Sequence, residues 1–137
     1  MIVADTGAVV ALLDADDHHH ASLRSAFEAE SDAWILPWAI LAEVDHIAAS
    51  QLGEKVARAF RNDLASGAFV VHWGDDADIQ RAVELDIRYA DLSLGLVDAV
   101  VMAVAERVSA RAIATLDLRD FSSVELVGAP ALWPRDL

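Results

Sequence analysis

The sequence predicts an α/β protein in which helices cover both faces of a short parallel sheet of four or five strands. Two observations carry this prediction. The segments with strand character are three or four residues long and apolar throughout, as expected of strands that are buried on both sides. Helical segments separate them, and this alternation is typical of parallel sheets.

The expected elements alternate along the whole chain. Strands are expected over residues 2–4, 33–36, 69–72, 112–115 and 124–127. Helices are expected over residues 8–13, 18–30, 38–50, 54–65, 75–88 and 93–109. Pro37 suits the first turn of the third helix, and Gly53 marks its end. Asp75 or Asp76 is the expected cap of the fifth helix, and Ser93 that of the sixth.

Composition limits the classes of protein that this chain can be. Its 137 residues are expected to form a single domain, 1–137, with a hydrophobic content of 55%. There is no cysteine, which excludes disulfides, thiolate metal sites and a cysteine nucleophile. We expect a cytoplasmic protein with no membrane span, because the start lacks an export signal and no apolar run reaches ~18 residues. The net charge of −13 argues against general nucleic-acid binding and favours cations or a basic partner.

The most informative stretch is SLGLVDAVVMAVA, residues 93–105, because it carries a single charge. Asp98 has Leu94, Val101 and Met102 as its helical neighbours, so it is expected on an apolar face. An unpaired carboxylate there costs several kcal/mol. No lysine or arginine lies within one helical turn. Its positive partner must therefore come from another part of the fold or be a metal ion.

Three further acids adjoin apolar elements. Asp5 follows the first strand, and Asp117 follows the fourth strand. Glu43 lies within the helix after Pro37, with Ile40 and Ile47 on its own helical face, so it is expected on an apolar face. Parallel sheets bind ligands at the carboxyl ends of their strands, so we expect the four acids to share one pocket. Oxygen ligands without histidine or cysteine suit Mg²⁺ or a similar hard cation. On pattern alone, Asp5 and Asp117 fit turns or helix caps equally well.

Four segments together resemble the PIN domain family, and most closely the VapC-type toxins of bacterial toxin–antitoxin pairs. They are IVADTGAVVALLD, ILPWAILAEV, DLSLGLVDAVVMAVAER and ATLDLRDF, and the third is the most specific. Their order and spacing match over essentially the whole chain. The resemblance implies a compact α/β/α sandwich and a ribonuclease that depends on Mg²⁺ or Mn²⁺.

The resemblance also implies site residues and partners. Asp5, Glu43 and Asp98 would be the metal-binding triad, with Asp117 as a fourth, more variable member. Thr6 and Thr115 match small hydroxyl residues that flank the site in this family. The implied partners are an RNA substrate, a small cognate antitoxin with a basic segment, and a second copy of the chain in a homodimer.

Two basic features have competing interpretations. Lys55, Arg58 and Arg61 recur every third residue and are candidate RNA contacts, although a solvated helix face explains them somewhat better. The run His18-His19-His20 invites a metal interpretation, but consecutive helical side chains point ~100° apart and do not converge on one ion. We therefore interpret this run as a solvated helix start.

A rival function remains open at this point. The chain would then be a non-catalytic acidic PIN-like module that binds a basic protein partner. The intact set of four acids argues for the enzyme, because a binding module does not require a metal-ligand set.

Overall fold

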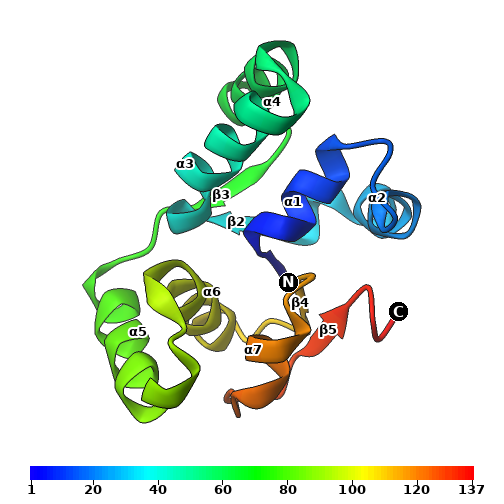
Figure 1. Ribbon diagram of the computed structural model, residues 1–137. Coiled ribbons are helices and arrows are strands. Elements are labelled where there is room, and N and C mark those ends of the chain that lie inside the picture. Colours follow the sequence, from blue (N-terminus) through cyan, green and yellow to red (C-terminus); the bar gives the residue numbers. More distant parts are fainter.

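A five-stranded parallel sheet forms the centre of the protein in the computed structural model, which describes residues 1–137 (Figure 1). Its strands are β1 (Ile2–Ala4), β2 (Trp34–Pro37), β3 (Val70–His72), β4 (Ala112–Ala114) and β5 (Ala131–Trp133). Their order in the sheet is β3-β2-β1-β4-β5, and every neighbouring pair is parallel. The predicted α/β class and parallel sheet are therefore confirmed.

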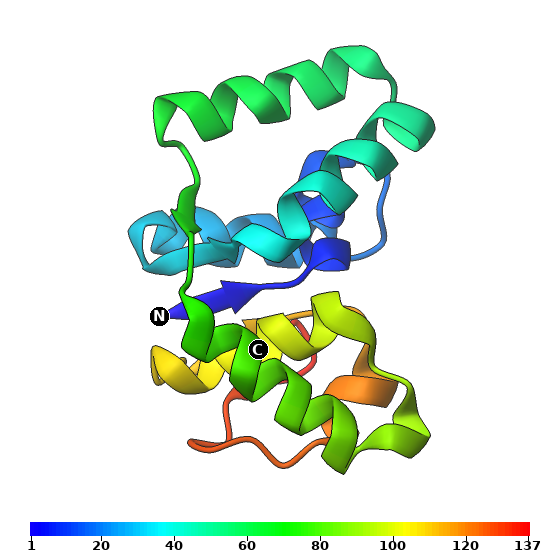
Figure 2. The ribbon, with the colours of Figure 1, turned by 90° about the vertical axis from the view of Figure 1, so that its left-hand side faces the viewer.

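Seven α-helices cover the two faces of this sheet. They are α1 (Thr6–Leu13), α2 (His20–Ala29), α3 (Trp38–Ile47), α4 (Glu54–Ser66), α5 (Asp76–Arg88), α6 (Gly95–Arg107) and α7 (Leu118–Ser123). Figures 1 and 2 show α1 to α4 on one side of the sheet and α5 to α7 on the other, which gives the expected α/β/α sandwich. None of these helices has the length and apolar character that crossing a membrane would require.

The apolar run of α6 forms the core on the face of the sheet that α5 and α6 cover. Seven consecutive residues, 99–105, are buried, because α6 lies between α5 on one side and strands β1 and β2 on the other. Trp34 of β2 is buried on the opposite face, 5.5 Å from the ring of Phe27 and 6.2 Å from the ring of Trp133. Packing of this extent holds the strand ends in fixed positions.

Three features of the fold differ from the sequence-based predictions. The fifth strand is Ala131–Trp133, and residues 124–127 form an irregular segment in which Val124 is buried without joining the sheet. Ser93 does not cap α6: it has a positive φ of 52° and ends a short 3₁₀ turn, and the helix begins at Gly95. Helix α7 was not predicted, because its six residues contain no apolar period long enough to recognise. Asp75 does cap α5, as predicted.

The strand order determines where a ligand can bind. The chain leaves β1 for β2 and β3 in one direction, and later adds β4 and β5 on the other side of β1. In open α/β sheets, ligands bind at the carboxyl ends of the strands on either side of such a reversal. Here those ends are Ala4 and Ala114, which pair in the sheet and lead directly into Asp5 and Thr115.

Candidate metal centre

Asp5 is held at the junction of β1 and β4. Its backbone N–H donates to the carbonyl of Ala114 at 2.8 Å, and the Thr115 hydroxyl donates to its Oδ2 at 2.9 Å. The residue is only 5% exposed. Two buried oxygens here, Oδ1 of Asp5 and Oγ1 of Thr6, have no hydrogen-bond partner. Buried polar atoms are rarely left unpaired, so this pair indicates a place for an additional ligand.

Asp117 is connected to Asp5 through the same threonine. Its backbone N–H donates to Thr115 Oγ1 at 3.1 Å, so Thr115 accepts from one aspartate and donates to the other. The Asp117 side chain also caps α7, where Oδ1 accepts from the backbone N–H of Asp120 at 3.2 Å. The helix-cap interpretation of Asp117 is thus correct, and the cap leaves Oδ2 available.

Asp98 reaches the same place from the first turn of α6. One carboxylate oxygen from each of Asp98, Asp117 and Asp120 lies within 4.8 Å of the others, and all three residues are partly buried. Sequence reasoning missed Asp120. The available signal was the motif Asp117-Leu118-Arg119-Asp120, in which an aspartate cap and an acid three residues later are typical of a helix start.

Glu43 lies at the edge of this group. The sequence placed it on an apolar helical face, and this placement was wrong: Ile40 and Val44 of α3 are buried, whereas Glu43 is exposed. It is nevertheless close enough for its charge to raise the pKa of both Asp5 and Asp98. Glu43 is thus an acid of the exposed rim.

Burial and neighbouring negative charges raise the pKa of two acids of the cluster. The pKa of Asp98 is raised to about 7, first by burial and then by the charges of Asp5, Asp117, Asp120 and Glu43 in that order. Burial also raises the pKa of Asp5 to about 6, against the lowering effect of the Thr115 hydrogen bond. No cationic side chain lowers the pKa of either Asp5 or Asp98.

No protein cation offsets the cluster, since none of these five acids takes part in an ion pair. The paired carboxylates lie elsewhere: on Glu28, Glu30, Asp45, Glu54, Asp75, Asp78, Glu84, Glu106 and Asp136. Carboxylate oxygens in this number and spacing are the ligands of hard divalent cations. The unpaired Oδ1 of Asp5 fits the same role, so the cluster could bind a metal ion.

The predicted basic stripe on α4 is partly neutralised. Arg61 donates to Asp45 at 2.6 Å and is also ion-paired with Glu54. Lys55 and Arg58 are exposed and form no ion pair, so they stay candidate RNA contacts while Arg61 joins α3 to α4.

His20 differs from His18 and His19 in its environment. Nδ1 of His20 donates to the Ala11 carbonyl at 2.8 Å and ties α2 to α1. His18 and His19 precede the helix, and no histidine belongs to the metal-binding group.

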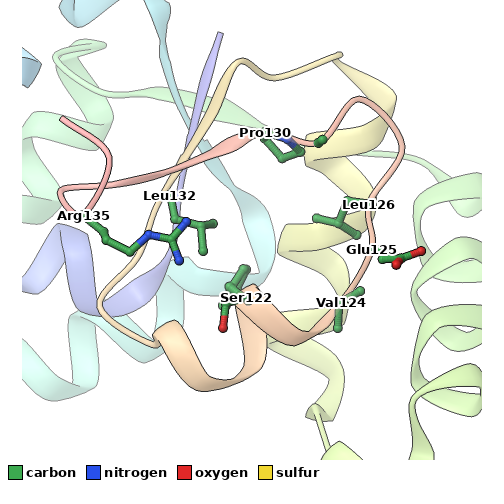
Figure 3. Close-up of a pocket in the computed structure, with 9 residues that line it drawn as sticks. Ser122, Val124, Glu125, Leu126, Pro130, Leu132 and Arg135 are labelled. Carbon is green, nitrogen blue, oxygen red and sulfur yellow. The ribbon is translucent and has the colours of Figure 1, made fainter.

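Two cavities lie near α7. The larger, about 470 Å³, is formed by α7, the following loop and β5. Figure 3 shows Leu126 and Leu132 in its wall and the Glu125 carboxylate pointing away from it. No acid of the cluster lines it. The second, about 380 Å³, includes Thr115 and therefore adjoins the cluster.

Comparison with known proteins gives the family. Residues 2–126 match the PIN domain family. The chain is 31% identical to Ribonuclease VapC26 of Mycobacterium tuberculosis over 127 residues, which is 93% of this chain and 94% of that one. The crystal structure of the M. tuberculosis VapC20 toxin, described as cleaving the sarcin–ricin loop, matches with a TM-score of 0.80 at 22% identity, over 95% of this chain and 99% of that one.

DNA-bound VapBC from Salmonella typhimurium has the same fold, with a TM-score of 0.73 at 16% identity over 96% of this chain and 95% of that one. The fold prediction is thus confirmed by solved structures, and the predicted resemblance is confirmed by the family match. The chain therefore belongs to the PIN domain family and is of the VapC type.

Proposed function

We propose that this protein is a VapC-type endoribonuclease that depends on Mg²⁺ or Mn²⁺ and hydrolyses RNA phosphodiester bonds in the cytoplasm. The observation that carries the proposal is the convergence of acids from β1, α3, α6 and α7 on one place without a protein cation. The named ribonuclease relative supports RNA as the substrate.

Each acid has a separate part in this proposal. Asp5, Asp98 and Asp117 bind the metal from inside the pocket, and Glu43 completes the set from the exposed rim. The hydroxyl of Thr115 fixes the positions of Asp5 and Asp117 relative to each other. When bound, the metal ion supplies charge stabilisation at the phosphate and lowers the pKa of the attacking water. Asp98, whose pKa lies near neutrality, is able to exchange a proton with water when no metal is present.

The proposed partners follow from charge and exposure. An acidic pocket on a chain of net charge −13 attracts the basic segment of an antitoxin, and one cationic side chain entering the pocket would displace the metal. A homodimer would cover the apolar stripe of α5, where Ile79, Val83 and Ile87 are 37%, 47% and 71% exposed. These residues recur every four positions and so form one face.

The catalytic proposal predicts metal-dependent cleavage. Wild-type protein should cleave RNA with Mg²⁺, lose activity in EDTA, and lose at least about 10²-fold in the Asp98→Asn variant, because charge stabilisation at the phosphate depends on the metal. Asp86→Asn, an exposed acid on α5, is the control and should retain activity. Cleavage that survives EDTA would contradict the mechanism, and capture of a basic peptide without any cleavage would favour the binding module.

The raised pKa values predict that the metal-free protein loses stability as the pH rises. A raised folded-state pKa contributes stability below the unfolded value near 4, and this contribution disappears as the pH passes about 6 to 7. Asp98→Asn should therefore stabilise the metal-free protein at pH 7.5 by about 1–2 kcal/mol, a value discounted for partial exposure, with little effect at pH 4. Urea unfolding in EDTA measures this, with Asp86→Asn as control. A destabilised Asp98→Asn protein at pH 7.5 would show that Asp98 has a structural partner.

Asp120 is proposed as an additional metal ligand. Asp120→Asn should weaken Mg²⁺ or Mn²⁺ binding about tenfold, since one of three neighbouring carboxylates loses its charge. The cap of α7 uses only the backbone N–H of Asp120, so the fold should not change. Calorimetric titration against Asp86→Asn tests this, and equal affinities would remove Asp120 from the site.

The homodimer has its own test. Replacing Val83 and Ile87 together by glutamate should convert the dimer to a monomer in sedimentation experiments, because charged side chains would face each other across the contact. Replacing exposed Glu84 by glutamine is the matched control on the same helix. Unchanged sedimentation of the double variant would move the contact to another face.

A further inference from the structure

A donor-lined cavity of about 380 Å³ opens beside the acidic cluster. Its walls include His18, His19, Ser22, Thr115, Leu118 and Arg135. None of the carboxylates of the cluster lines it, although Thr115 belongs to both places. In a chain of net charge −13, a cavity with two imidazoles and a guanidinium is chemically distinct from its surroundings.

The cavity lies at the same edge of the sheet as the proposed metal centre. Ala114 pairs with Trp133, so the following residues, Thr115 and Pro134, are neighbours at a strand spacing of ~4.8 Å. Figures 1 and 2 show that α2 also begins on the side where β1 ends. A nucleotide whose phosphate contacts the acids through a metal would therefore have its neighbour at this cavity.

Local contacts hold His18 and His19 in place, but their ring nitrogens have no hydrogen-bond partner in the protein. The His18 and His19 rings meet edge to face at 5.1 Å, and the His19 backbone N–H donates to Asp17 Oδ1 at 2.7 Å. Ser22 Oγ donates to the His19 carbonyl at 3.2 Å. No protein group hydrogen-bonds to the ring nitrogens of His18 or His19, whereas His20 is used within the fold.

The guanidinium groups add donors of fixed charge. Arg135 uses Nε and Nη2 to bind Asp136, which leaves Nη1 free. Arg119 is exposed, forms no ion pair and lies in α7 between Leu118 of the cavity and Asp120 of the cluster. Asp17 and Asp136 oppose this positive charge, so the cavity is rich in donors without being strongly cationic.

We propose that this cavity binds the phosphate and ribose of the nucleotide next to the bond that is cleaved. The proposal rests on the ribonuclease function proposed above. Imidazole and guanidinium N–H groups are donors suited to phosphate oxygens, and such contacts position the backbone without reading sequence. The cavity is a poor site for the basic segment of an antitoxin, because no carboxylate lines it to pair with the cations of that segment.

The test compares substrate affinity with turnover in a double variant, His18→Gln with His19→Gln. With a short mixed-sequence RNA that the wild type cleaves, KM should rise about tenfold, the effect of losing one charged hydrogen bond, while kcat and Mg²⁺ affinity stay within twofold. Arg135→Gln should flatten the dependence of log affinity on log salt by about 0.7, the value for one phosphate contact to a single strand.

Matched controls lie outside the cavity. Arg24→Gln changes the exposed face of α2, the helix that follows the two histidines, and Arg88→Gln removes an exposed cation of α5 that forms no ion pair. Both should leave KM unchanged. Binding of labelled RNA to the Asp98→Asn protein, with and without the cavity substitutions, tests the cavity independently of catalysis. If the wild type does not cleave RNA but RNA binding depends on the cavity, the nuclease function would be overturned and the RNA-binding cavity retained.

Two results would overturn the cavity proposal. One is that both cavity variants keep the KM, the RNA affinity and the salt dependence of the wild type. The other is unchanged RNA binding combined with weaker capture of a basic peptide, which would assign the cavity to a protein partner.

Discussion

The hydrogen bond from Thr115 to Asp5 fixes the geometry on which the site depends. It joins two strands that are 110 residues apart in sequence, at the point where the strand order reverses. A buried carboxylate with one unpaired oxygen is unfavourable by itself, and it persists because β1 and β4 are wholly buried around it and residues 99–105 of α6 are buried against the sheet. The fold thus stabilises an arrangement of like charges that the acids alone would not adopt.

The sequence predicted this fold, and most of the acids that the fold brings together, because the relevant signals are local. Four short apolar runs that form strands and the helical segments between them specify a parallel sheet, and a lone Asp98 in an apolar helix is an anomaly that calls for a cation. Residues 124–127 were wrongly predicted as a strand because an apolar run can pack against a core without pairing in a sheet. Pairing depends on a neighbouring strand, which the run itself does not reveal. Glu43 was misplaced for a similar reason: Ile40, one turn earlier, and the adjacent Val44 are buried, yet the rotation of α3 leaves Glu43 exposed. Recognising Asp120 required knowing that α7 exists, and a helix of six residues is too short to show a helical period in the sequence.

The distribution of charge resolves a conflict between composition and function. A net charge of −13 should repel RNA, and six of the ten basic side chains are already occupied by acids. The unpaired ones are few, and one of them, Arg119, lies in α7 between Leu118 of the donor-lined cavity and Asp120 of the cluster. In the proposed function, an acidic nuclease would therefore bind its substrate through a metal ion at one point and through donors beside it, without a basic surface.

In the proposed function, metal binding and inhibition have the same physical basis. The neighbouring acids raise the pKa of Asp5 and Asp98, so a cation that enters would stabilise the folded protein by relieving this repulsion. A divalent ion and a cationic side chain of an antitoxin would then compete for the same carboxylates. The repulsion among the acids would strengthen the binding of both, and the one that is bound would determine whether the water beside the phosphate is activated.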